Sequence, residues 1–148
     1  MRLLPFFPLL FLLAACASTA PYSKRDLQQV REVHRLVVPD YENFKAAYLR
    51  HDDRVMQSWY YRSEADCRIE DRVDKRDTID PNTKLFEASA LLDSICNDIE
   101  AAWTYWRKAH HLRYDKALVP AALTDAWQDG DLDVKKIPAL LRHPRQLS

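Results

Sequence analysis

The sequence predicts an all-α protein, a small helical bundle built on a long antiparallel helical hairpin. Six prolines follow residue 20, and they fall between segments of helical periodicity, as expected if proline marks helix ends. Within those segments apolar residues return every three or four positions, which is the spacing of one helix face. A pair of cysteines placed symmetrically about the expected turn supports the hairpin. We therefore expect four helical segments around one core.

The first expected helix covers about residues 24–38. It opens with Ser23, and Asp26 follows three residues later, which is similar to a capping box at a helix start. Its apolar residues share one face. We expect these to point inward: Leu27, Val30, Val33 and Val37.

The second expected helix runs from about Tyr41 into the seventies, with Asp40 as its cap. Its residues that share an inward stripe are Phe44, Tyr48, His51, Val55, Trp59, Ile69 and Val73.

The third expected helix begins after Asp80 and Pro81, a cap followed by proline at the first helical position, and continues to about Lys116. It carries the clearest amphipathic signal in the chain. The residues on its narrow stripe are Leu85, Leu92, Cys96, Ile99, Trp103 and His110.

The last expected segment covers residues 120–128, with a turn at Asp129 and Gly130. The apolar residues expected to close the core beyond this turn are Leu132, Ile137, Leu140 and Leu141. Residues 144–148 are expected to be frayed.

Cys67 and Cys96 are expected to form a disulfide between the second and third helices. In an antiparallel pair, residues equally far from the turn face each other, and these two are equidistant from Pro81 and Asn82. On a continuous helix, however, Cys67 lies away from the stripe of Ile69. The second helix therefore either breaks near Ser63 or changes its buried face there, and the sequence does not choose.

The first residues have the layout of an export signal: a positive start at Arg2, an apolar stretch over residues 3–13, and small residues after it. The stretch is shorter than the ~20 apolar residues that a membrane-spanning helix needs. The run Leu13, Ala14, Ala15, Cys16 resembles the lipobox of bacterial lipoproteins. The alternative is an ordinary secretory signal, with Cys16 incidental.

The resemblance implies that residues 1–15 are removed and that Cys16 receives diacylglycerol and a further acyl chain such as palmitate. Residues 16–23 would be a lipidated tether and residues 24–143 a single helical domain. Because Ala17, not aspartate, follows the cysteine, the resemblance implies anchoring at the outer membrane, facing the periplasm. In that oxidising compartment a disulfide between Cys67 and Cys96 is the normal outcome.

Composition excludes several functional classes. The chain has a single glycine, Gly130, so the glycine-rich loops of nucleotide-binding enzymes are absent. The formal net charge is zero and charges of both signs are interspersed, so we expect no basic face and no nucleic-acid partner. We find no catalytic motif and expect neither an enzyme nor a cofactor.

Two weaker groups carry candidate chemistry. The hairpin register places Trp59 and Tyr60 opposite Trp103 and Trp106, an aromatic layer that is either core or the lining of a ligand pocket. Further from the turn, His51 comes level with His110, which makes these histidines weak candidates for metal binding without a recognisable ligand motif.

The functional expectation is a lipid-anchored, non-catalytic module that binds a protein partner in the cell envelope or stabilises an assembly there. The alternative is a periplasmic carrier of a small ligand or metal, which would use the aromatic layer or the two histidines.

Overall fold

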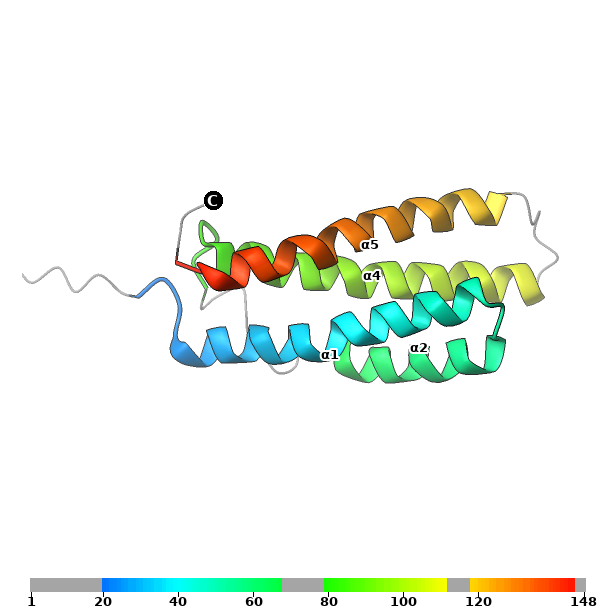
Figure 1. Cartoon of the computed structure of the whole chain (residues 1–148), viewed down its shortest axis with the longest axis horizontal. Coiled ribbons are helices and arrows are strands. Elements are labelled where there is room, and N and C mark those ends of the chain that lie inside the picture. Colours follow the sequence, from blue (N-terminus) through cyan, green and yellow to red (C-terminus); the bar gives the residue numbers. More distant parts are fainter. Residues whose placement is uncertain (1–19, 68–78, 112–117, 146–148) are drawn as a thin grey trace, which may run out of the picture.

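The computed structural model describes residues 20–67, 79–111 and 118–145, which form an elongated all-α bundle (Figure 1). Its helices are α1 (Lys24–Leu49), α2 (Asp53–Cys67), α4 (Lys84–His111) and α5 (Leu118–Arg142). α1 and α4 run in one direction, and α2 and α5 run back (Figure 1). The predicted fold class is confirmed, and no described helix is long and apolar enough to cross a membrane.

α1 is longer than expected because it continues through Pro39. The prediction that a first helix ends near residue 38 and that Asp40 caps a second one is therefore wrong. A proline removes one backbone hydrogen bond from a helix, but Pro39 is exposed, so water can satisfy the freed carbonyl. The exposed Pro138 lies inside α5 in the same way.

The chain turns at residues 50–52, not near Ser63. His51 adopts a left-handed backbone conformation there, with φ 56°. The side chain of Asp52 accepts a hydrogen bond from the backbone N–H of Val55 at 3.1 Å, which caps the start of α2. His51 is exposed in this turn, so its predicted place on an inward stripe is wrong.

The break at residues 50–52 also sets which face of α2 is buried. Met56 and Ser63 are buried, and Tyr60 and Cys67 are partly buried, so these four form one stripe at helical spacing. Cys67 therefore lies on the inward face without any break at Ser63. The two other members of the predicted stripe, Ile69 and Val73, lie outside the described residues.

α4 confirms its predicted stripe in the part that is described. Leu85, Leu92, Ile99 and Trp103 are each at most 5% exposed, and Cys96 packs against them. The start of the helix differs from the prediction, since Thr83 rather than Asp80 caps it. The hydroxyl of Thr83 accepts the N–H of Phe86 at 3.3 Å.

α5 is continuous across Gly130, so the predicted turn there is wrong. Gly130 is buried against the ring of Tyr41 on α1, and an added Cβ would lie 2.5 Å from the Tyr41 hydroxyl oxygen. The continuous helix also changes which residues face inward. Ile137, Leu140 and Leu141 are buried as expected, but Leu132 is 63% exposed.

Three chain segments meet at the end of the bundle where α1 and α4 begin and α5 ends, which we call the proximal end (Figure 1). The N–H of Asp80 donates to the carbonyl of Pro21 at 2.8 Å, and the N–H of Leu85 donates to the carbonyl of Pro144 at 3.3 Å. Pro144 is thus tied to α4 and does not belong to a frayed tail. The opposite end, which holds the turn between α1 and α2, is the distal end.

Candidate functional site

A group of stacked aromatic rings joins α2 to α4 in the distal half of the bundle. Trp103 stacks on Tyr60 with ring centroids 4.5 Å apart and on Trp106 at 4.9 Å. Tyr61 meets Trp103 edge-on at 6.2 Å. We call these four residues the aromatic seam. Tyr60 and Trp103 are equidistant from Pro81 and Asn82, so the register that predicts the disulfide also places this contact.

Two side chains of the aromatic seam, Tyr60 and Trp106, donate hydrogen bonds to carboxylates. The hydroxyl of Tyr60 donates to Glu100 at 2.6 Å, and the indole N–H of Trp106 donates to Asp53 at 3.1 Å. Burial, together with the hydrogen bond to Glu100, raises the pKa of Tyr60 above its usual value. Its phenol therefore stays protonated at neutral pH and acts as a hydrogen-bond donor, not as a base.

Trp59 is separate from the other three predicted pocket residues. It is partly buried and lies 5.0 Å from the guanidinium of Arg62, which reaches Asp40 on α1. The structure thus brings together Tyr60, Trp103 and Trp106. Because Trp103 stacks on two rings at once, a flat ligand would have to displace one of them to bind its face.

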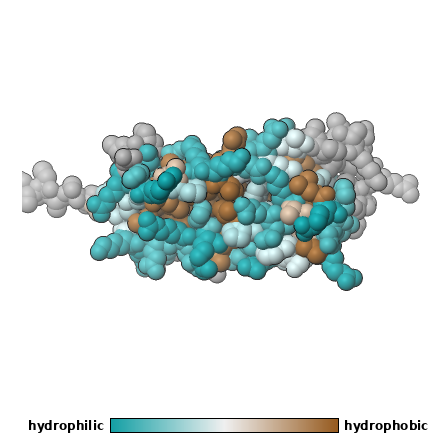
Figure 2. Space-filling view, in the orientation of Figure 1, coloured by the Kyte–Doolittle hydropathy of each residue, from teal (hydrophilic) through white to brown (hydrophobic). Residues whose placement is uncertain are grey.

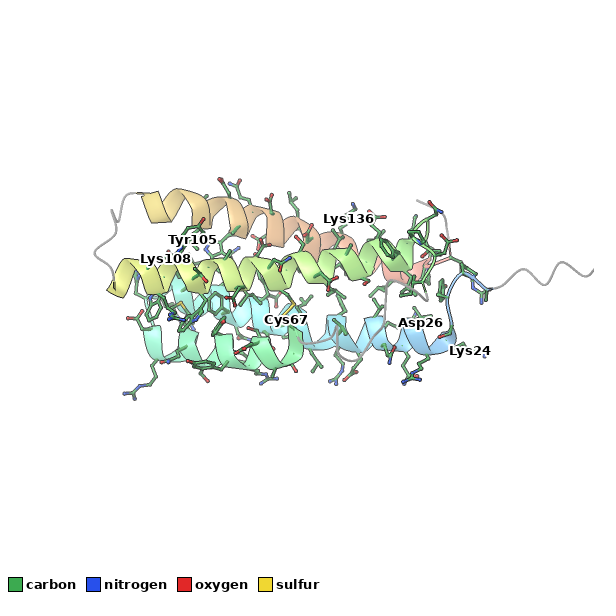
Figure 3. The ribbon with its side chains drawn as sticks, turned by 180° about the vertical axis from the view of Figure 1, so that it is seen from behind. Lys24, Asp26, Cys67, Tyr105, Lys108 and Lys136 are labelled. Carbon is green, nitrogen blue, oxygen red and sulfur yellow. A yellow bond between two sulfur atoms is a disulfide. The ribbon has the colours of Figure 1, made fainter. Side chains whose placement is uncertain are left out.

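The disulfide between Cys67 and Cys96 is present, with a Cα–Cα distance of 5.8 Å. Figure 3 labels Cys67 where α2 ends against α4. Cys96 precedes Trp103 by two helical turns, so the disulfide and the aromatic seam lie along the same face of α4. The aromatic seam attaches the middle of the short α2 to α4, and the disulfide attaches its last residue.

A buried carboxyl group lies beside this attachment. Asp40 in α1 is fully buried, and the Nε of Arg62 lies 3.1 Å from its Oδ1, yet neither carboxyl oxygen has a well-directed hydrogen bond. Burial, reinforced by the nearby Asp66, raises the pKa of Asp40 to about 7, and Arg62 opposes the shift. The sequence feature that indicates a buried Asp40 is its spacing from Val37 and Phe44. In a helix that continues through Pro39, all three residues lie on one face.

Asp40 should make the protein less stable as the pH rises. A folded-state pKa above the unfolded value means that the folded chain holds more protons between about pH 4 and 7, so stability falls across that window. We expect Asp40→Asn to abolish the share of this loss that Asp40 carries, at least about 1 kcal/mol between pH 4 and 8, because asparagine does not titrate. Urea unfolding at pH 4, 6 and 8 would measure it. The exposed Asp125→Asn is the control, and a parent-like slope in Asp40→Asn would contradict the assignment.

Asp98 in α4 contributes to the same pH dependence. Its Oδ2 is buried without a hydrogen-bond partner, and burial, with the charges of Asp133 and Asp129 on α5, raises its pKa to about 6. Despite these neighbouring carboxylates, no group of three or more His, Cys, Asp or Glu residues in the described chain is arranged to hold a metal ion.

The described residues give no contact between His51 and His110, the two histidines considered for metal binding. His51 is exposed in the turn between α1 and α2, and the side chain of His110 lies outside the described residues. The carboxylates beside His51 already have structural partners, since Asp52 caps α2 and Asp53 accepts the indole N–H of Trp106.

Comparison with known proteins gives no relative: no family model, no curated protein and no solved structure matches the chain.

Proposed function

We propose that the chain is a bacterial lipoprotein, anchored through Cys16 at the outer membrane, whose helical bundle binds a protein partner in the periplasm without catalysing a reaction. The anchor rests on the lipobox-like run that ends at Cys16. The bundle is a long rod, since α1 alone has 26 residues and spans roughly 39 Å.

The observation that carries the interaction function is the exposure of large apolar side chains in the distal half. Leu49 is 60% exposed, Tyr61 is 56% exposed and Tyr105 is 38% exposed. Figure 3 places Tyr105 toward the end remote from Lys24. Tyrosine is enriched at protein interfaces because it combines apolar area with a hydrogen-bonding hydroxyl. The distal half is therefore where we expect the partner to bind.

The anchor has a direct test. We expect the parent protein to incorporate labelled palmitate and to sediment with outer membranes, and Cys16→Ser to lose the label and stay uncleaved. Ala17→Asp is the matched variant, expected to keep the lipid but remain in the inner membrane. Unlipidated parent protein in the soluble periplasmic fraction would support the ordinary secretory signal instead.

The partner can be sought by photo-crosslinking in living cells. We expect a crosslinker at Tyr61 or Tyr105 to yield one product of defined mass, and a crosslinker at the exposed Gln28 near the proximal end to yield none of that mass. Absence of any product from the distal positions would contradict the interaction function.

The alternative carrier function has less support. A carrier needs a recess that its ligand can enter, whereas the rings of the aromatic seam stack on one another. Native mass spectrometry of the purified domain would overturn this preference by detecting a stoichiometric ligand or metal.

A further inference from the structure

The fold sorts charges along the bundle although the sequence intersperses them. Three segments meet at the proximal end, residues 21–31, 80–87 and 136–145, and they hold seven lysines and arginines against three acidic residues. The basic residues are Lys24, Arg25, Arg31, Lys84, Lys136, Arg142 and Arg145. The expectation that no face carries a basic excess is therefore wrong at this end.

Each of the three acidic residues of the proximal end has a structural partner, and Asp80 accepts the backbone N–H of Asn82 at 2.9 Å. Asp26 is only 6% exposed and accepts the backbone N–H of Ser23 at 2.7 Å. Glu87 pairs with Lys136 at 2.6 Å. By contrast, Lys24, Arg25, Arg31, Arg142 and Arg145 are exposed. The ion pair removes one charge of each sign, so the net charge of this end stays at four positive charges, seven basic less three acidic residues.

Acidic side chains lie close together instead in the middle of the bundle, where Asp98 on α4 is near Asp129 and Asp133 on α5. Figure 2 shows a face that is mostly hydrophilic along its length, with scattered apolar patches. The acidic group in the middle of the bundle thus contrasts with the basic excess of the proximal end.

We propose that the proximal end is a docking surface for the anionic phospholipid headgroups of the membrane that carries the anchor, so that the bundle stands end-on. This rests on the proposed lipidation of Cys16, because α1 begins only eight residues after it. The linker over residues 17–23 spans at most about 25 Å. A tether this short keeps the basic end at high effective concentration next to the bilayer.

The chemistry of the surface suits a bilayer better than a discrete ligand. Exposed lysine and arginine side chains attract a diffuse layer of negative headgroups, and each one near such a surface raises partitioning by roughly fivefold. The attraction is screened beyond a Debye length of roughly 8 Å at physiological salt. The end of the bundle must therefore lie in contact with the headgroups.

The first experiment uses the chain from Ala17 onward, exported with a signal that lacks a lipobox. Among the described residues the buried apolar side chains run from Tyr22 to Leu141, and this chain retains all of them. We expect it to partition at least about tenfold more strongly to vesicles of phosphatidylcholine with roughly 30% phosphatidylglycerol than to phosphatidylcholine alone, and to dissociate in about 0.5 M NaCl. Equal binding to the two vesicles would overturn the proposal.

Matched charge variants test the position of the surface. The proximal variant carries Lys24→Gln, Arg25→Gln, Arg142→Gln and Arg145→Gln. The distal control carries Arg50→Gln, Arg54→Gln, Arg107→Gln and Lys108→Gln, which removes the same charge from exposed residues at the other end. We expect at least about a tenfold loss of vesicle binding for the proximal set and less than about twofold for the control. Equal losses would overturn the proposal.

Tryptophan fluorescence tests the end-on orientation of the bundle, because all four tryptophans lie away from the proximal end. The nearest, Trp127, packs against Tyr41 and Phe44, and Tyr41 is 17 residues along α1 from Lys24, a rise of roughly 25 Å. We expect brominated phosphatidylglycerol to leave tryptophan fluorescence almost unquenched. Strong quenching would show that the bundle lies flat and would overturn end-on docking.

Nucleic acid is the competing polyanion. Binding of a random DNA duplex as tightly as phosphatidylglycerol vesicles at the same salt would overturn recognition of a bilayer. None of these measurements uses the lipid on Cys16, so their failure would leave the anchor and the distal partner site to stand on their own tests.

Discussion

Replacing both Cys67 and Cys96 by alanine should lower the free energy of unfolding by ~3 to 4 kcal/mol. The two residues are 29 positions apart, and closing a loop of that size removes conformational entropy from the unfolded chain. A domain of this size has a total stability of roughly 5 to 15 kcal/mol, so the loss would be a large fraction. Urea unfolding of the double variant against the oxidised parent measures it.

Removal of the disulfide should destabilise α2 before the other helices. In this helix only Met56 and Ser63 are buried, whereas α1 buries eight residues. Hydrogen exchange should therefore rise across residues 53–67 before it rises in α1 or α4. Chemically reduced parent protein is the control and should behave like the double variant. A change below about 1 kcal/mol, or exchange that rises evenly in every helix, would contradict this role.

The sequence correctly predicted two kinds of feature. One is an apolar stripe along a single helix, and the other is contact between residues that lie equally far from a turn. The stripe of α4 is such a feature, because its apolar residues repeat without interruption from Leu85 to Trp103. The pairing of Cys67 with Cys96 and of Tyr60 with Trp103 needed only the antiparallel register. The capping box of Ser23 and Asp26 is local and was predicted correctly.

The helix boundaries near Pro39 were predicted incorrectly because proline acts through its surroundings. Proline destabilises a helix because one backbone hydrogen bond is missing. Water can replace that bond where the proline is exposed, and the tertiary fold determines which positions are exposed. Once α1 was cut at Pro39, Asp40 was read as a cap instead of a buried carboxyl. His51 was then placed inside a helix, although it forms the turn.

The same error limits what the sequence says about the candidate site. The rotation of α2 about its own axis is fixed by the turn at residues 50–52. That turn points Tyr60 at Trp103 and leaves Trp59 beside Arg62. A register argument fixes the height of a residue along a helix pair but not the direction of its side chain, so it grouped Trp59 with the other rings.

Gly130→Ala should lower the free energy of unfolding by about 2 kcal/mol, although alanine is the better helix former. An added Cβ would lie 2.7 Å from two carbons of the Tyr41 ring. Tyr41 is 1% exposed, and the single proton of its hydroxyl is shared between two acceptors at 3.1 Å, the carbonyl of Trp127 and Asp131, so the ring cannot easily move. Contacts this short place overpacking at the upper end of its usual cost, roughly 3 kcal/mol, and the ~1 kcal/mol that alanine gains in a helix leaves a net loss of about 2 kcal/mol.

A double-mutant cycle separates the two effects. In a Tyr41→Ala background the added methyl group has room, so Gly130→Ala should become stabilising by up to about 1 kcal/mol. The sign of the substitution would thus reverse with the loss of one ring, measured by urea unfolding of all four proteins. A Gly130→Ala effect of the same sign and size in both backgrounds would show that Tyr41 is not the obstacle. The reversal would establish that Gly130 is required for the close approach of α5 to α1. Local sequence rules assign this glycine to a turn instead.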